Sequence, residues 1–163
     1  MTNLHEPHFE IEGNQRGFRY RRARLGYQAG CERLGVSPWE LPPGEATPYG
    51  YHYGNEELLI VLAGSPSMRT PDGWRGLREG DLVSFPVGDW GAHQFLNQTH
   101  APIRLLMFSE MGGPEVTVYP DSKKIGVFET TMAPERGGFA GTFRIEDAVD
   151  CYEGERPPDV GTS

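Results

Sequence analysis

The sequence predicts an all-β protein, folded as a sandwich or as a barrel such as a jelly roll. Three features indicate this class: abundant turn-forming residues, short apolar runs of strand length, and near-regular spacing between them. The chain of 163 residues contains 22 glycines and 14 prolines. This frequency of turn formers argues against a helix bundle or a coiled coil. The length suits a single domain with one hydrophobic core.

From residue 35 onward, strand-like runs alternate with turns. Each run is bounded by Gly, Pro or polar turn residues. The sequence Pro71-Asp72-Gly73 between two runs is a strong hairpin signal. In chain order, the predicted strands cover residues 36–41, 49–53, 57–63, 67–70, 74–77, 82–85, 93–97, 103–108, 116–119 and 125–128, and a glycine-rich link then leads to a last short segment at 143–152.

The segment before these strands is basic, although the chain as a whole is acidic. Five arginines lie between Arg16 and Arg24, interleaved with Phe18 and Tyr20. The pattern favours a charged edge strand that resists sheet-to-sheet aggregation. A phosphate site or a dimer contact is the functional alternative. We expect a flexible arm at residues 1–15, a single domain at 16–152 and a disordered tail at 153–163.

The overall charge excludes several classes of partner. The formal net charge is −8 and the isoelectric point is about 5.1, so we expect no nucleic acid and no anionic membrane as a partner. The longest apolar run, 58–63, is too short to cross a bilayer, and the amino terminus lacks the apolar segment of a signal peptide. Cys31 and Cys151 form no CxxC pair. A reducing, cytoplasmic setting fits these features.

Two histidines and one glutamate in the strand-rich part are candidate metal ligands. His52 ends one predicted strand and Glu57 begins the next, so a hairpin would place both side chains on one side. His93 opens a later strand, after a glycine-containing loop. Imidazole and carboxylate together suit Fe, Mn, Ni, Cu or Zn. A surface glutamate with two structural histidines is the alternative interpretation.

The order of these residues resembles the two motifs of the cupin superfamily. Six residues separate Glu57 from Gly64, as in the first motif. The resemblance covers residues 44–97, with the first motif at about 44–64 and the second at about 80–97. The matching positions are Gly44, His52, Glu57 and Gly64 in the first motif, and Gly80, Pro86, Gly88, His93 and Asn97 in the second.

This resemblance implies the cupin double-stranded β-helix, a jelly-roll barrel, here with extensions at both termini. The wider run from residue 34 to residue 148 is similar to small bacterial mono-cupins proposed to be sugar-phosphate isomerases. The resemblance also implies a homodimer that pairs through terminal strands. It implies His52, Glu57 and His93 as ligands of a divalent metal ion, which could be Fe, Mn, Ni or Zn.

The chain departs from the family pattern at Gly50. The first histidine of the family's HxH pair would stand there, two residues before His52. Losing this ligand could weaken metal binding. It could also leave the two-histidine, one-carboxylate set of an open metal site, as in non-haem iron oxygenases. A second departure is the distance from Gly88 to His93, which is two residues longer than usual.

Two functions of different kinds follow from these residues. The first is a metal-dependent mono-cupin that binds or transforms a small molecule, by dioxygenase or by isomerase or epimerase chemistry. The second is a non-catalytic cupin that binds a small ligand and has a degenerate or empty metal site. Catalytic residues are not assigned. The expected pocket residues are Gly50, Trp90, Phe95 and Asn97.

Overall fold

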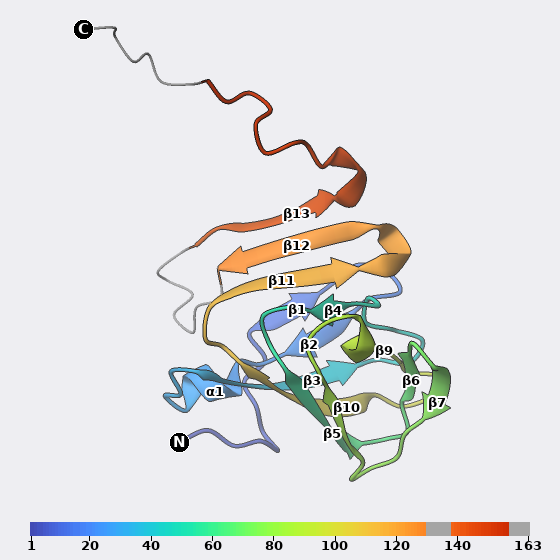
Figure 1. The fold of residues 1–163 in the computed structure, drawn as a ribbon. Coiled ribbons are helices and arrows are strands. Elements are labelled where there is room, and N and C mark those ends of the chain that lie inside the picture. The colour runs from blue at the N-terminus through green and yellow to red at the C-terminus, as the bar shows by residue number, and fades with distance from the viewer. Residues whose placement is uncertain (130–137, 157–163) are drawn as a thin grey trace, which may run out of the picture.

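The computed structural model describes residues 1–129 and 138–156 (Figure 1). Residues 157–163 of the expected tail, and Gly137 of the glycine-rich link, lie outside the described residues. The strands are β1 (Ile11–Gly13), β2 (Tyr20–Arg22), β3 (Leu34–Leu41), β4 (Tyr51–His52), β5 (Glu57–Ala63), β6 (Ser67–Thr70), β7 (Gly73–Gly76), β8 (Leu82–Phe85), β9 (Gln94–Leu96), β10 (Ile103–Glu110), β11 (Pro114–Tyr119), β12 (Lys124–Glu129) and β13 (Ala140–Arg144). The helical elements are α1 (Leu25–Gln28) and the 3-10 turns η1 (Asp89–Gly91), η2 (Pro120–Ser122) and η4 (Ile145–Asp147).

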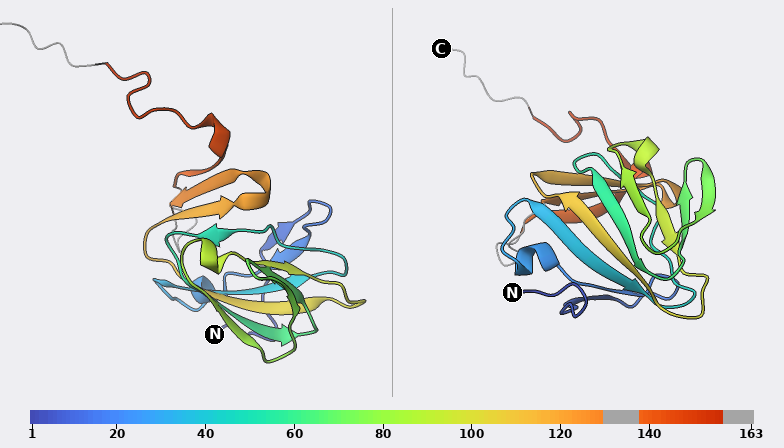
Figure 2. Two further views of the ribbon diagram at one scale, coloured as in Figure 1. Left: turned by 45° about the vertical axis from the view of Figure 1, so that its right-hand side comes forward. Right: turned by 90° about the horizontal axis from the view of Figure 1, so that it is seen from below.

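The strands form three antiparallel sheets. The largest has the order β1-β2-β3-β10-β5-β8, the second β13-β12-β11-β4, and the third β7-β6-β9. The sheets face one another around a common interior, and the four-stranded sheet covers one end of it (Figures 1 and 2). The arrangement is the all-β jelly-roll fold that the sequence predicts.

The hydrophobic core lies between the six-stranded and the three-stranded sheet. Alternate residues of each strand point inward, because side chains alternate across a strand. From β5, Leu59 and Val61 are buried, and from the opposite sheet Met68 and Phe95 meet them. The core cluster comprises Leu41, Leu59, Val61, Met68, Leu77, Phe85, Phe95, Ile103 and Leu105.

Most predicted strands agree with the structure, and three of them coincide in both bounds: β5, β6 and β8. The hairpin at Pro71-Asp72-Gly73 is confirmed by the antiparallel pairing of β6 with β7. The predicted hairpin between His52 and Glu57 is wrong. β4 pairs with β11 and β5 pairs with β8 and β10, so residues 53–56 cross from one sheet to another.

The basic segment also differs from its prediction as an edge strand. β2 lies between β1 and β3, so β1 is the edge of that sheet. Residues 11–13, within the predicted arm, form this edge strand. The described residues include no helix with the length and apolar character that a membrane span requires.

Candidate functional site

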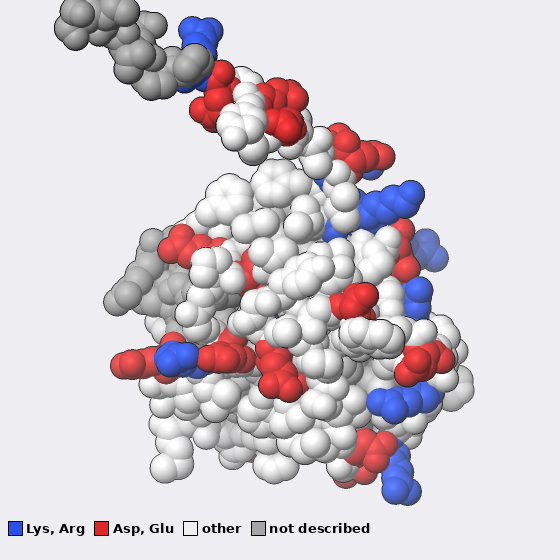
Figure 3. All heavy atoms as spheres, in the orientation of Figure 1, with Lys and Arg blue, Asp and Glu red and all other residues white. Residues whose placement is uncertain are grey.

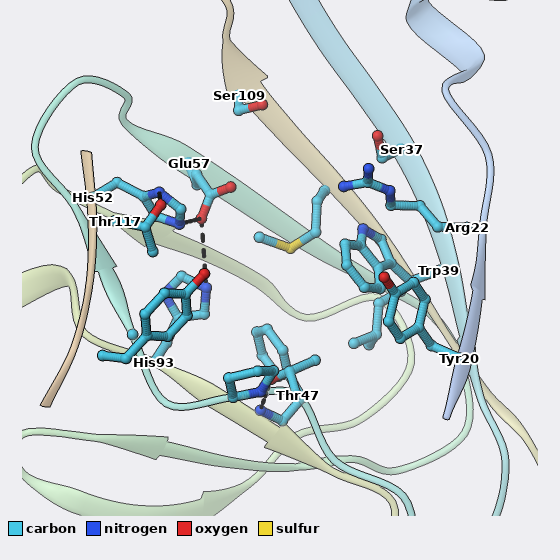
Figure 4. Close-up of a pocket in the computed structure, with 16 residues that line it drawn as sticks. Tyr20, Arg22, Ser37, Trp39, Thr47, His52, Glu57, His93, Ser109 and Thr117 are labelled. Atoms are coloured by element: carbon cyan, nitrogen blue, oxygen red, sulfur yellow. Dashed lines mark hydrogen bonds and ion pairs between the residues drawn. The ribbon is translucent and has the colours of Figure 1, made fainter. Parts of the chain in front are cut away.

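Two histidines and one glutamate meet where β4, β5 and the start of β9 approach one another. His52 belongs to β4, Glu57 is the first residue of β5, and His93 directly precedes β9. The Oε2 atom of Glu57 lies 3.2 Å from Nε2 of His52 and 3.5 Å from Nε2 of His93. The structure therefore brings together the three side chains that the sequence suggests as metal ligands (Figure 4).

Backbone hydrogen bonds to β4 fix the position of His93. The amide of Gly50 donates to the carbonyl of His93 at 3.1 Å, and the amide of His93 donates back at 2.9 Å. The amide of Gly88 donates to the carbonyl of His52 at 2.7 Å. The 3-10 turn η1 lies between these two attachments. The segment from residue 88 to residue 93 is therefore held at one end to His52 of β4 and at the other to Gly50, the residue before β4.

Outer partners orient both imidazole rings. The Nδ1 atom of His52 lies 3.1 Å from Oε1 of Glu115 and 3.2 Å from Oγ1 of Thr117. The Nδ1 atom of His93 lies 2.9 Å from the carbonyl oxygen of Gly91, to which it can only donate. Each Nδ1 atom is thus occupied away from Glu57. Such contacts are the usual way in which a protein directs a ligating Nε2 atom.

Charge within the cluster is set by burial and by these contacts. Burial alone would disfavour a charged His52, but contacts with Glu115 and Glu57 outweigh it and raise its pKa to about 10. Burial lowers the pKa of His93, so this ring is neutral at pH 7. Burial would raise the pKa of Glu57, but the two histidines and Arg22 lower it overall. The cluster therefore holds an imidazolium between two carboxylates, beside a neutral imidazole.

Glu115 and Thr117 were missed by sequence reasoning. Both are buried on β11, with exposed fractions of 4% and 6%. They are two residues apart and so share one face of the strand. The alternation of polar and apolar residues from Glu115 to Val118 is a sequence signal for this face. The strand that the sequence predicts here begins at Val116, one residue after Glu115.

The surroundings of Gly50 explain how the chain accommodates its departure from the cupin pattern. A Cβ atom added at this position would lie 3.0 Å from the carbonyl oxygen of Val118 and 3.4 Å from Cδ1 of Tyr119. The ring of Tyr119 and the backbone of β11 thus occupy the space that a side chain would need. A histidine at position 50 would require β11 to shift.

A cavity of about 350 Å³ opens beside the cluster. One wall carries His52, Glu57, His93 and Thr117, and the facing wall carries Tyr20, Arg22, Ser37 and Trp39 (Figure 4). Apolar side chains of β9 and β10, including Met107, also line the cavity. The cavity thus combines an apolar interior with two polar walls, as small-molecule sites usually do.

Of the four expected pocket residues, two line the cavity and two lie elsewhere in the fold. Gly50 and Phe95 line the cavity. Trp90 is 79% exposed and lies at a separate surface depression with Tyr49 and Tyr51. Asn97 is fully buried, and its side-chain amide donates to the carbonyls of Leu41 and Ala101. Asn97 therefore braces the loop before β10 and does not face the cavity.

The donor atoms of the cluster are of the kinds that bind a divalent metal ion, although the side chains are not arranged around an ion position. Within residues 1–129 and 138–156, no group of three or more His, Cys, Asp or Glu side chains stands ready to hold a metal. The Oε2 atom of Glu57 is nevertheless buried and accepts no hydrogen bond from the described residues. Two imidazole Nε2 atoms face this carboxylate oxygen. Nitrogen and oxygen donors of these kinds suit Zn and the transition metals.

The comparisons with known proteins agree with the fold. Residues 38–109 match the family described as the Cupin domain. No curated protein sequence is significantly similar to the chain. Among solved structures, a sugar phosphate isomerase of the cupin superfamily from Silicibacter pomeroyi is 24% identical, with 91% of this chain and 94% of that chain covered and a TM-score of 0.77.

Two further structures share the fold. A proposed sugar phosphate isomerase from Acidithiobacillus ferrooxidans is 22% identical over 82% of this chain and 81% of its own, with a TM-score of 0.71. A predicted oxalate decarboxylase from Thermotoga maritima is 19% identical over 68% of this chain and 97% of its own, with a TM-score of 0.57. Residues 38–109 of the chain therefore match the Cupin domain, and the chain shares its fold with these cupin structures.

Proposed function

We propose that this protein is a mono-cupin that holds a divalent metal ion through His52, Glu57 and His93 and uses the adjoining cavity for a small molecule. One observation carries the proposal: the Nε2 atoms of both histidines face the same oxygen of Glu57 while their Nδ1 atoms are bound elsewhere. A bound ion would polarise an oxygen atom of the small molecule. The proposal includes a cytoplasmic location, which the free thiols of Cys31 and Cys151 support.

The residues of this chain would bind and orient the small molecule between the two walls. Phe95 and Met107 would contact an apolar part of this molecule. The neutral ring of His93 leaves a lone pair directed toward Glu57. Both dioxygenase and isomerase or epimerase chemistry are compatible with this arrangement. The isomerase and decarboxylase names of the structural neighbours belong to those proteins, and they only favour testing both classes.

A second candidate is a metal-free cupin that binds a small ligand without turnover. The charge of His52 supports it, because an imidazolium with a pKa of about 10 already offsets part of the negative charge of the surrounding carboxylates. A positive ring at this place supplies part of the charge that a metal ion would otherwise bring. Gly50 also supports this candidate, because the cluster has one ligand fewer than the cupin pattern.

Metal analysis separates the two candidates. The purified protein is loaded in turn with Fe, Mn, Ni and Zn, passed through a desalting column and analysed by inductively coupled plasma mass spectrometry. We expect about one ion per chain for at least one metal, and a loss of that ion in His93→Gln. His100→Gln is the matched control, because His100 is exposed and does not line the cavity. Content far below one ion with every metal would favour the metal-free candidate.

We also propose that two copies pair through the C-terminal strand. β13 is at the edge of its sheet, so its outer backbone groups are available for pairing. Phe139 and Phe143 are 58% and 49% exposed and stack on each other with ring centroids 6.2 Å apart. Figure 3 shows mainly uncharged atoms over β12 and β13. An exposed apolar edge of this kind is typical of an interface.

Light scattering after gel filtration tests the dimer. We expect the mass of two chains for the wild type and a shift toward one chain in Phe143→Ser. Trp74→Ser is the control, because Trp74 is 53% exposed on β7, far from this edge in the fold. A wild type with the mass of a single chain would refute the dimer.

A further inference from the structure

The structure divides the basic segment of the N-terminal region into two groups of arginines. Arg19, Arg21 and Arg24 each pair with a carboxylate. Arg19 contacts Glu45 at 2.6 Å, Arg21 pairs with Glu40, and Arg24 contacts Glu10 at 3.2 Å. These three arginines therefore have structural partners that account for their charge.

Arg22 differs from these neighbours because it points into the cavity. Side chains alternate along β2, so Tyr20 and Arg22 face inward while Arg21 faces outward. The guanidinium of Arg22 lies 4.9 Å from the ring centroid of Trp39. Its Nε atom is buried and has no hydrogen-bond partner among the described residues. Burial lowers the pKa of Arg22, which remains charged at pH 7.

An unpaired guanidinium of this kind is costly to bury unless a ligand compensates it. Removing a charge from water without a partner is strongly unfavourable. Stacking on Trp39 uses only the face of the guanidinium. The N–H groups at its edge stay available, and they match the oxygens of a carboxylate or phosphate group.

The residues around Arg22 offer further donors on the same wall. The hydroxyl groups of Tyr20 and Ser37 belong to this side of the cavity (Figure 4). Across the cavity lie His52, Glu57 and His93. The charge of Glu57 is close enough to raise the pKa of Arg22, so the two walls act on one shared volume. A ligand that fills about 350 Å³ can reach both walls.

We propose that Arg22, with the hydroxyl groups of Tyr20 and Ser37, forms an oxyanion subsite that holds a carboxylate or phosphate group of the small molecule. The opposite end of that molecule would face the His52–Glu57–His93 cluster. The inference deepens the proposed function by naming the chemical class of the ligand: a small organic acid or a phosphate ester. The position of the opposite end of the ligand depends on the proposed function, whereas binding of the anion at Arg22 does not.

Calorimetric titration of the full-length protein with two probes tests the subsite. The probes are inorganic phosphate and malonate, each in a chloride buffer at pH 7. We expect saturable binding of at least one probe and a loss of about tenfold or more in affinity in Arg22→Gln, because charge-assisted hydrogen bonds are removed. The probe that binds more tightly identifies the source of the oxyanion.

Arg21→Gln is the matched control. Arg21 is the adjacent residue of the same strand, carries the same charge and pairs with Glu40 outside the cavity. We expect its affinity for either probe to stay within twofold of the wild type. Equal losses in the two variants, unchanged binding in Arg22→Gln, or no saturable binding of either probe would overturn the subsite.

Arg22→Lys covers the case in which Arg22→Gln does not fold. It keeps the positive charge but removes the planar pair of donors, so we expect weaker binding of malonate than in the wild type. Wild-type affinity for both probes would count against the subsite.

Metal content, measured on the same samples, separates this proposal from the metal centre. We expect Arg22→Gln to hold as much metal as the wild type. Preparations that take up none of the four metals on loading, yet still show the Arg22 dependence, would refute the metal centre and support the subsite. Metal-loaded preparations without that dependence would refute the subsite and leave the metal centre standing.

Discussion

The apolar core and the polar cavity are built on the same inward faces of the same strands. β5 and β10 are paired so that Val61 faces Leu105, Leu59 faces Met107, and Glu57 faces Ser109. Along both strands the inward residues are therefore apolar at one end and polar at the other. Where the side chains are apolar the sheets close on one another, and where they are polar the cavity opens.

This difference separates residues that stabilise the fold from residues that serve the site. Leu59 and Val61 are almost fully buried and surrounded by apolar groups. Two strand positions away, the cavity wall holds buried charges. Buried charges of this kind are typical of functional sites. Substitutions in the core are therefore expected to act on stability alone, whereas substitutions in the site also change pH dependence or metal binding.

The largest expected effect is the loss of stability in Leu59→Ala. Removing this buried side chain leaves a void and should lower the free energy of unfolding by about 2–5 kcal/mol. Urea denaturation followed by circular dichroism measures this loss. Leu82→Ala is the control, because Leu82 is 61% exposed on the neighbouring strand β8 and should change stability by no more than about 0.5 kcal/mol. Equal losses in the two variants would contradict the location of the core.

The second effect is a fall in the stability of the chelator-treated protein as the pH rises. The pKa of His52 is about 10 in the folded chain, above its ordinary value of 6.5. Its contribution is therefore complete below pH 6.5 and is lost as the pH rises through 10. We expect a decrease on the order of a few kcal/mol, measured as the urea midpoint between pH 6 and pH 10. Glu115→Gln should flatten this slope, and an unchanged slope would contradict the assignment.

The third effect concerns metal affinity in Glu115→Gln. Glu115 orients His52 through Nδ1, so the variant should bind metal about 10–100-fold more weakly. Competition with a coloured chelator measures the affinity. Glu110→Gln is a suitable control, since Glu110 is exposed and pairs with Arg33 on the surface. If both variants bind metal like the wild type, Glu115 has no orienting role.

The smallest expected effect is in Gly50→Ala. The new methyl group would press against the carbonyl of Val118 and the ring of Tyr119, at a cost of about 1 kcal/mol in stability. In Gly76→Ala the added group meets no atom within 4 Å, so thermal unfolding of the two variants isolates the crowding. If they are equally stable, then β11 yields easily, and Gly50→His should tighten metal binding.

Much of the architecture could be predicted, because local signals define short strands well. The bounds of β5, β6 and β8 follow from apolar runs that end at Gly, Pro or charged residues. The sequence correctly predicts that His52 and Glu57 lie close together, but it attributes this to a hairpin that does not form. The two residues are close because β4 and β5 belong to different sheets that meet at a corner. Sequence spacing alone does not distinguish such a corner from a hairpin.

The missed residues come from strands that are distant in the sequence. Arg22 lies on β2 and lines the cavity, whereas Glu115 lies on β11 and contacts His52, and both positions arise only when the sheets close. The sequence alone does not show which of the five arginines in this segment points into the cavity. The alternation of β2 and its pairing with β3 decide which of them turns inward. The function of Arg22 is therefore a property of the tertiary structure.

The attachment of residues 88 and 93 to β4 has a consequence for how this protein can vary. Because both ends of the loop are tied to the strand that carries His52, the residues between them can change in number without displacing His93. Within the loop, residues 89–91 form η1, with Trp90 directed outward. Insertions in this loop are therefore expected to change the surface depression beside Trp90 while the two histidines keep their positions.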